Sequence, residues 1–312
     1  MTVRREAPPV VGVVGAGRIG AVHVGNLIRL GARVCVAEPD PRRRAVVERE
    51  FGCPTVSDPA DLPDVAGVVV ATPTRTHVDV VRATLTRRVP ILLEKPCAAD
   101  PVLSAELGTA ADRVGVPLRI GFQRRQAPEF VALRRAMTDR CGTVGFAAFT
   151  SLDGTPPPAG YQVAGGSLAY DLQIHDIDLV RWLFDSPVVE VSAVQADRRG
   201  AVDLLVTTLR LASGTVCSLV GKRISGAGCE VWAHLVGDVS SIDTRQLHEP
   251  RTHIDFRSRF AEAYEREAAS FLRLVRGGAD TLPDWRDAVA AEDVCQRVEK
   301  SLTAAVLEPQ HG

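Results

Sequence analysis

Three side chains capable of acid and base chemistry follow one another at helical spacing near the middle of the chain. Asp171, His175 and Asp178 are separated by four and then three residues, and apolar residues occupy positions 172, 174, 177 and 179. At about 100° per residue, the three fall within about 60° on one side of an α-helix. An imidazole exchanges protons near neutral pH, and a nearby carboxylate can orient its ring and stabilise the imidazolium. The spacing indicates either a proton-transfer site or a helix face exposed to water.

The first third of the chain has the pattern of a parallel sheet covered by helices. Short runs that are apolar on both faces alternate with segments of helical spacing. The expected strands are 10–14, 33–37, 67–71, 91–93 and 118–120, and the expected helices are 19–30, 41–51, 76–87 and 101–114. Strands that are apolar on both faces and joined by helices are typical of a doubly wound α/β domain. We therefore expect a first domain over residues 1–121.

After residue 121 the pattern changes to consecutive strands between flanking helices. Helices are expected at 128–137, 168–184, 258–276 and 284–306, and strands at 144–150, 188–197, 202–211, 215–222 and 229–237. Sequential strands joined by short turns form a largely antiparallel sheet. Residues 122–312 are therefore predicted to form an α+β domain with an open, largely antiparallel sheet.

Composition excludes several classes of protein. The 37 basic and 38 acidic residues nearly balance, which argues against nucleic acid or an anionic membrane as the main partner. The seven cysteines are scattered and odd in number, as expected for reduced thiols rather than disulfides or a structural zinc site. No stretch approaches the roughly 20 apolar residues of a membrane span. We expect a soluble, cytoplasmic protein without a bound metal.

A glycine-rich loop follows the first strand and opens the first helix. It reads Gly15-Ala16-Gly17-Arg18-Ile19-Gly20, and Glu38 ends the second strand 18 residues later. In this context the glycines permit a tight turn, close approach of a pyrophosphate and packing of helix on strand. A carboxylate at position 38 would hold ribose hydroxyls and repel a 2′-phosphate. We predict that the cofactor is NAD rather than NADP, although the arginines at 42–44 are an alternative phosphate site.

The carboxyl ends of the third and fourth strands should border the same cofactor. Ligands bind at this edge of doubly wound sheets, which places Thr72, Pro73, Thr74 and His77 beside the dinucleotide. Glu94, Lys95 and Pro96 come directly after the fourth strand. The Lys95 ammonium could hydrogen-bond a substrate oxygen whose carbon gives or takes hydride.

These motifs together resemble those of the Gfo/Idh/MocA oxidoreductases. The resemblance covers nearly the whole chain and rests on four stretches: the glycine loop, Glu94-Lys95-Pro96, Gly121 to Arg125, and Gly165-Gly166 to Asp178. It implies a Rossmann domain that binds NAD through the glycine loop, Glu38, the residues at 72–74 and 77, Glu94 and Lys95. It also implies a catalytic group of Lys95, Asp171 and His175, with His175 as the acid and base. Family members often form oligomers through the C-terminal sheet, so a homodimer or homotetramer is expected.

Within the family, the pattern is most similar to that of inositol 2-dehydrogenases. The matching residues are an arginine pair at 124–125, Asp153 before the prolines at 156–158, and the segment from Ile174 to Asp178. The resemblance implies that Asp178, Arg125 and Asp153 contact substrate. Those enzymes usually have Asn-Ser-Arg followed by a tyrosine, whereas this chain has Gly221-Lys222-Arg223 and then small residues at 225–228. They also commonly have Tyr-Asp or Phe-Asp after the arginine pair, where this chain has Gln-Ala-Pro. A smaller side-chain wall near residues 225–228 would admit a larger substrate, such as an aminocyclitol or an amino sugar.

The sequence thus predicts an NAD-dependent dehydrogenase that oxidises a secondary hydroxyl of a cyclitol, sugar or amino sugar, or reduces the matching ketone. A second interpretation is a non-catalytic, dinucleotide-bound regulatory protein on the same fold, although such relatives are expected to lose the lysine or the histidine. A third is a divalent metal site formed by Asp171, His175 and Asp178, with His77, in a hydrolase or lyase.

Overall fold

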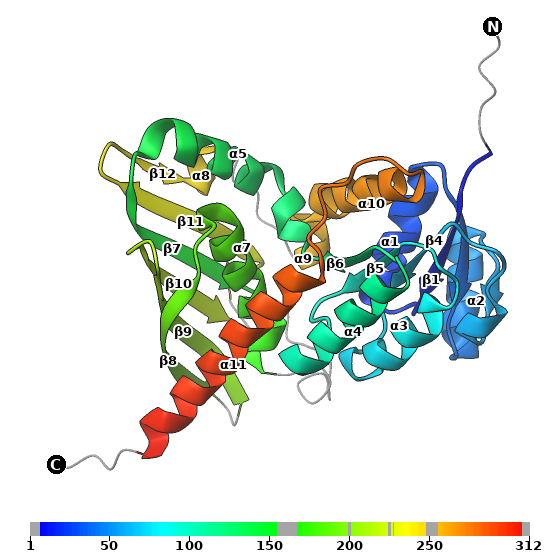
Figure 1. Cartoon of the computed structure of the whole chain (residues 1–312), viewed down its shortest axis with the longest axis horizontal. Coiled ribbons are helices and arrows are strands. Elements are labelled where there is room, and N and C mark those ends of the chain that lie inside the picture. The colour runs from blue at the N-terminus through cyan, green and yellow to red at the C-terminus, as the bar shows by residue number, and fades with distance from the viewer. Residues whose placement is uncertain are drawn as a thin grey trace, which may run out of the picture. The chain divides into compact units, whose positions relative to one another are not determined.

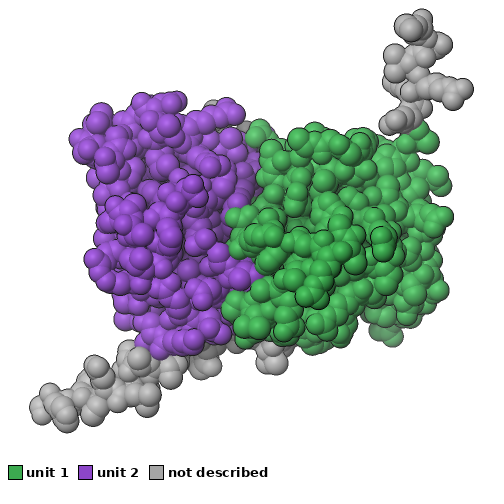
Figure 2. All heavy atoms as spheres, in the orientation of Figure 1, with its two compact units in different colours: residues 1–122, 264–288 green, residues 123–263, 289–312 purple. Residues whose placement is uncertain are grey.

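The computed structural model describes residues 7–154, 167–198, 201–223, 226, 228–247 and 255–307 (Figure 1). By their internal contacts they form two compact units, coloured separately in Figure 2. The first unit comprises residues 1–122 and 264–288, and the second comprises 123–263 and 289–312. Residues 264–288 pack with the first unit although they lie far along the chain from residues 1–122.

The first unit is built on a six-stranded parallel sheet in the order β3-β2-β1-β4-β5-β6. Its strands are β1 (Val10–Val14), β2 (Arg33–Ala37), β3 (Thr55–Val56), β4 (Gly67–Val70), β5 (Ile91–Glu94) and β6 (Leu118–Gly121). Its helices are α1 (Arg18–Arg29), α2 (Pro41–Phe51), α3 (His77–Leu85), α4 (Pro101–Arg113) and the 3₁₀ turns η1 (Pro59–Asp61) and η2 (Thr74–Thr76). This strand order is that of the doubly wound dinucleotide-binding fold, so the prediction is confirmed.

Helix α10 (Ala261–Val275) completes the core of the first unit. Its Phe271 and Leu272 are buried in the same cluster as Val11 and Val36 of the sheet and Leu27 of α1. Gly67 opens β4 where this helix passes. A Cβ on Gly67 would lie 2.6 Å from Val275 and 3.1 Å from Phe271. The first sheet therefore depends on a helix nearly 150 residues downstream of β6, which no local pattern reveals.

The second unit holds a six-stranded mixed sheet in the order β12-β11-β7-β10-β9-β8. The strands are β7 (Val144–Leu152), β8 (Val188–Arg198), β9 (Ala201–Leu211), β10 (Val216–Lys222), β11 (Glu230–Gly237) and β12 (Ser241–Asp243). The helices are α5 (Pro128–Ala136), α7 (Ile174–Phe184), α8 (Thr244–Leu247), α9 (Phe256–Arg259) and α11 (Trp285–Leu307), with a 3₁₀ turn η3 (Gln123–Gln126) and π-turns η4 (Met137–Cys141) and η5 (Ala169–Gln173). Only the β7 and β10 pairing is parallel, so the largely antiparallel prediction is confirmed.

The segment expected as one α-helix over 168–184 differs in its first turn. Residues 169–173 form the π-turn η5, and the regular helix α7 begins at Ile174. Gln173 fixes this turn to the sheet, because its amide donates to the carbonyls of Leu205 and Leu219 and accepts from Thr207. A π-turn is wider than an α-turn and is frequent at functional sites. Asp171 therefore lies on the π-turn, whereas His175 and Asp178 lie on the regular helix.

Every helix among the described residues is too short or too polar to span a membrane. All seven cysteines are buried as free thiols, as expected for a chain without a disulfide framework.

Candidate active site

The glycine loop has the geometry that its spacing predicts. Gly15 has a φ of 96°, and a Cβ there would lie 2.6 Å from the carbonyl oxygen of Ala71. A Cβ on Gly20 would lie 2.0 Å from the carbonyl oxygen of Gly15. A Cβ on Gly17 would meet nothing within 4 Å among the atoms of the structure. Gly15 and Gly20 are thus required by the fold, whereas Gly17 keeps open a space at the N-terminus of α1, where a pyrophosphate binds in this fold.

This difference predicts opposite outcomes for two matched substitutions. Gly17→Ala should leave the melting temperature nearly unchanged but weaken NAD binding about tenfold or more, since it removes close backbone approach worth about 1.5 kcal/mol. Gly20→Ala should instead lower the melting temperature, because its methyl group overlaps the Gly15 carbonyl. Thermal unfolding and NAD titration of both variants check this. A Gly17→Ala protein with normal NAD affinity would show that the open space does not face the cofactor.

Glu38 stands directly after β2 and is hydrogen-bonded to the glycine loop. The backbone N–H of Ala16 donates to its Oε2 at 2.8 Å, and that of Asp40 donates to its Oε1 at 3.0 Å. The side chain is buried, and each carboxylate oxygen has a second lone pair that can accept from a ribose hydroxyl. The charge is therefore fixed beside the loop that would carry the cofactor phosphates.

The arginines at 42–44 are arranged around Glu38. Arg44 donates to the carbonyls of Glu38 and Pro39, and Arg43 lies 4.0 Å from the Glu38 carboxylate. Arg42 and Arg43 also line a hollow of about 200 Å³ beside the loop; its other lining residues are Ala16, Ala21, Val46, Val47, Glu50 and Phe51. Arg44 is thus committed to the backbone, and Arg43 remains close to a fixed negative charge.

The loops after β4 and β5 are tied together by His77. Its Nδ1 lies 2.9 Å from the carbonyl oxygen of Pro96, and its Nε2 lies 2.8 Å from that of Thr72. Thr72 is also bonded to the hydroxyl of Thr76, which closes the η2 turn containing Thr74. Burial lowers the pKa of His77, and a neutral ring can donate to only one of the two carbonyls. His77 thus connects the two loops at this edge of the sheet, including the residue after Lys95.

Glu94 and Lys95 differ in their surroundings. Glu94 is the last residue of β5, and its carboxylate accepts a hydrogen bond from His23 of α1 at 2.8 Å inside the unit. Lys95 follows it and is half-buried. His23 was not singled out in the sequence, because it reads as an ordinary position on a buried helix face.

In the second unit, the Asp/His segment is buried rather than exposed to water. His175 is 7% exposed, and Asp178 is 1% exposed. The alternative of a solvated helix face is therefore wrong. Asp171 is paired with Arg223, whose Nη2 lies 2.6 Å from its Oδ2. Arg223 is the first residue after β10, and its guanidinium holds the Asp171 carboxylate one turn before His175.

Two consecutive arginines hold two carboxylates of α7. Arg125 makes a two-pronged contact with Asp178, at 2.9 Å and 2.6 Å. Arg124 lies 2.6 Å from Asp176, which also accepts from the hydroxyl of Ser151 on β7 at 2.8 Å. Burial raises the pKa of Asp176, and the Arg124 charge and these hydrogen bonds oppose that rise. The turn η3 thus fixes the orientation of α7, and Asp176 is a buried partner of the arginine pair that the sequence pattern did not isolate.

Asp153 lies at the end of β7, where two glycines meet. It is half-buried, and its backbone N–H donates to the carbonyl of Lys222 at 2.9 Å. A Cβ on the next residue, Gly154, would lie 2.4 Å from the Cα of Gly228. Gly228 ends the segment of small residues at 225–228. Ser225 and Ala227, and the prolines at 156–158 and Gly165 and Gly166, lie outside the described residues.

The proposed metal site of Asp171, His175 and Asp178 does not form as a cluster of ligand atoms. Within the described ranges, the histidine, cysteine and acidic side chains whose ligand atoms converge within 4.8 Å are His23, Glu94 and Glu267. The carboxylates of Asp171 and Asp178 are instead paired with Arg223 and Arg125. An arginine at each carboxylate disfavours a cation there.

Comparisons with known proteins place the chain in a family. Residues 10–122 match the family described as "Oxidoreductase family, NAD-binding Rossmann fold", and residues 132–243 match its C-terminal domain. The chain is 33% identical over 318 residues to myo-inositol dehydrogenase Hyg17 of Streptomyces leeuwenhoekii, covering 94% of this chain and 97% of that protein. It is 30% identical to an inositol 2-dehydrogenase of Rhizobium meliloti, covering 93% and 94%.

A solved structure agrees with these relatives. The crystal structure of a myo-inositol dehydrogenase from Corynebacterium glutamicum superimposes with a TM-score of 0.84 at 25% identity, covering 96% of this chain and 97% of that one. The fold, the glycine loop and the whole-length similarity therefore agree. The chain belongs to the Gfo/Idh/MocA oxidoreductase family, and it is an NAD(P)-dependent oxidoreductase that resembles inositol dehydrogenases.

Proposed function

We propose that the chain oxidises a secondary hydroxyl of a cyclitol, sugar or amino sugar, or reduces the matching ketone, with His175 as general acid and base. The observation that carries this proposal is the burial of His175 one turn after an arginine-paired Asp171. A buried imidazole with fixed charges around it is suited to proton transfer. The relatives named as inositol dehydrogenases support the substrate class.

In the proposed mechanism, three side chains serve one reaction. His175 takes the hydroxyl proton, and Asp171, held by Arg223, stabilises the resulting imidazolium. The Lys95 ammonium donates a hydrogen bond to the substrate oxygen and offsets the negative charge that develops there. The glycine loop and Glu38 would hold NAD, which would supply the acceptor for the hydride of the carbinol carbon; loss of that hydride and of the hydroxyl proton turns the alcohol into a ketone.

Substrate contacts are proposed for Arg125, Asp153 and Asp178. The Asp178 carboxylate is held by Arg125 and can still accept from a hydroxyl, because each oxygen has a second lone pair. A Cβ on Gly154 would lie 2.4 Å from the Cα of Gly228, so no side chain fits at position 154. The small residues at 225–228 are the reason for including aminocyclitols and amino sugars among the proposed substrates.

The test is an NADH absorbance screen of the purified protein with inositols, aminocyclitols, monosaccharides and aminoglycosides, run in parallel with NADP. Substrate-dependent NADH formation with one of these classes is the expected result. The absence of turnover with all of them, despite NAD binding, would favour the regulatory alternative. Unchanged turnover after chelation is expected, since the mechanism uses no metal ion.

Glu38 is proposed to select NAD. Replacing it with alanine should raise kcat/KM with NADP relative to NAD by about tenfold or more, because a charge that repels the 2′-phosphate is removed while Arg43 remains. The measurement is kcat/KM with both cofactors, and Glu48→Ala on the exposed face of α2 serves as the control. An unchanged ratio in Glu38→Ala would mean that the carboxylate does not face the 2′-position.

We also propose a homodimer or homotetramer formed through the second sheet. Phe146 of β7 lies opposite Val236 of β11, and both are partly exposed, as is Val194 of β8. An apolar sheet face of this kind is typical of an interface between copies. Light scattering of Val194→Glu against the wild type tests this, with dissociation as the expected result.

A further inference from the structure

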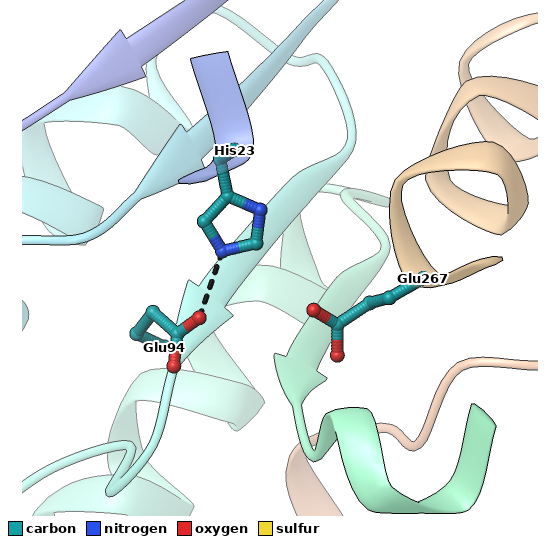
Figure 3. A group of neighbouring side chains, drawn as sticks. All are labelled: His23, Glu94 and Glu267. Carbon is teal, nitrogen blue, oxygen red and sulfur yellow. Dashed lines mark hydrogen bonds and ion pairs between the residues drawn. The ribbon is translucent and has the colours of Figure 1, made fainter. Parts of the chain in front are cut away.

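A buried group of three titratable side chains lies inside the first unit, and the proposed reaction does not use it directly. His23 comes from α1, Glu94 from the end of β5 and Glu267 from α10 (Figure 3). Their nearest ligand atoms lie within 4.8 Å of one another, and His23 and Glu267 are 0% exposed. Figure 3 shows the Glu267 carboxyl directed toward the other two. Such a group is either a cation site or a place where protons are shared.

The bond between His23 and Glu94 favours shared protons. His23 Nε2 lies 2.8 Å from Glu94 Oε1, and a carboxylate can only accept, so Nε2 carries the proton. Nε2 therefore offers no lone pair to a metal ion, and the remaining lone pair of the ring is on Nδ1. Nδ1 of the same ring is buried without a hydrogen-bond partner among the residues that the structure describes.

Glu267 has the surroundings of a neutral acid. Both of its oxygens are buried, and neither has a hydrogen-bond partner among the described residues. An ionised carboxylate is costly to bury without partners, and the negative charge of Glu94 adds repulsion. Burial first, and then that repulsion, raise the pKa of Glu267 well above its ordinary value. A protonated Glu267 supplies an O–H group facing the Glu94 carboxylate.

We propose that His23, Glu94 and Glu267 form a buried triad in which neutral Glu267, packed beside the His23–Glu94 pair, is a positioning residue for Lys95. The triad fixes the side chain of Glu94 immediately before Lys95, and His77 holds the Pro96 carbonyl immediately after it. The two residues that flank Lys95 in the sequence are therefore each in contact with a buried histidine, His23 of α1 or His77 of α3. The functional part of this inference rests on the role proposed for Lys95, whereas the protonation of Glu267 does not.

The first test compares melting temperatures of the wild type and Glu267→Gln from pH 5 to pH 9, with NAD bound. An amide imitates the neutral acid but cannot ionise. Because the folded pKa of Glu267 is raised, its contribution is fully present at low pH and is lost as pH rises toward that pKa. The melting temperature of Glu267→Gln relative to the wild type should therefore increase with pH. A difference that stays constant with pH would show that Glu267 is ionised, and it would overturn the triad.

The groups that surround this site make the comparison specific. Glu94 is the charged group that acts on Glu267, His23 donates to Glu94, and His77 also experiences the charge of Glu94. All of them are unchanged in Glu267→Gln. Glu265→Gln, on the exposed side of the same helix and 3.5 Å from Arg29, is the matched control and should show no such widening.

The second test concerns Lys95. Glu267→Ala should lower kcat by about 10- to 100-fold, as expected for a displaced catalytic group, while Glu267→Gln restores it to within about twofold of the wild type. A glutamine variant as impaired as the alanine variant would overturn the positioning role. A stoichiometric divalent metal in the purified wild type, lost in Glu267→Gln, would overturn the triad in favour of a cation site. Melting temperatures and metal analysis need no substrate, so they separate failure of the triad from failure of the proposed reaction.

Discussion

Replacing His175 with alanine is expected to lower kcat by about 10²- to 10⁴-fold, the usual contribution of a general acid and base. The His175 side chain is 7% exposed, and the carboxylates of Asp176 and Asp178 on the same helix are paired with arginines. His175 is the one histidine of α7, so no other imidazole of this helix can replace it. NAD affinity should stay within about twofold of the wild type, because the glycine loop belongs to the first unit. Steady-state turnover and NAD titration measure the two effects.

His234→Ala is the matched control for this substitution. His234 is a half-buried histidine of β11 in the same unit, and it has no place in the proposed chemistry. It should retain nearly full kcat. If His175→Ala retained most of its turnover on a good substrate, another group would have to be the base.

Replacing Arg124 with alanine is expected to destabilise the protein by about 3–5 kcal/mol, the range for breaking one partner from a buried ion pair. Arg124 is 3% exposed, and Asp176, at 1%, would be left with only the Ser151 hydroxyl as its hydrogen-bond donor among the contacts described above. Arg135→Ala, an exposed arginine on α5, should have an effect below about 0.5 kcal/mol. Denaturant unfolding of both variants gives the comparison.

The pH dependence of the Arg124→Ala variant has a definite sign. Without the arginine, burial raises the pKa of Asp176 unopposed by that charge. A raised folded pKa gives stability that is present at low pH and lost as pH rises through it. The stability gap between the variant and the wild type should therefore widen from pH 4 toward neutrality. A gap that narrows with rising pH would mean that Asp176 is not the group left unpaired.

Arg124→Met combined with Asp176→Leu should recover much of the lost stability, because the double variant leaves no buried charge.

The sequence predicts the first sheet well because its signals are local. Runs such as Val10–Val14 are apolar on both faces, and helices such as Pro41–Phe51 begin with a proline after an aspartate that caps the helix. The glycine loop is equally local: the roles of Gly15 and Gly20 follow from their spacing, and the distances from their Cβ positions bear them out. The two-residue strand Thr55–Val56 was missed because it is too short to show a pattern.

What the sequence did not predict depends on contacts between distant residues. The residues around Arg124 do not predict its contact with Asp176, which is 52 residues away. The residues around His23 likewise do not predict its contact with Glu94, which is 71 residues away. The sequence predicts an α-helix across the π-turn at Ala169–Gln173, because apolar periodicity does not distinguish the two kinds of turn over five residues. His23 and Glu267 are polar residues on helix faces that are otherwise apolar. A polar residue at such a position is the sequence signal that indicates a buried polar group.

The packing of α10 against the first sheet limits how fragments and chimaeras of this protein can be designed. A fragment ending at residue 122 would leave uncovered the apolar surface that Phe271, Leu272 and Val275 occupy, including the notch at Gly67. The cofactor-binding module is therefore not a contiguous cassette. An exchange of this module between relatives has to transfer 264–288 together with 1–122, and the chimaera then carries three junctions, at 122/123, 263/264 and 288/289, in place of one.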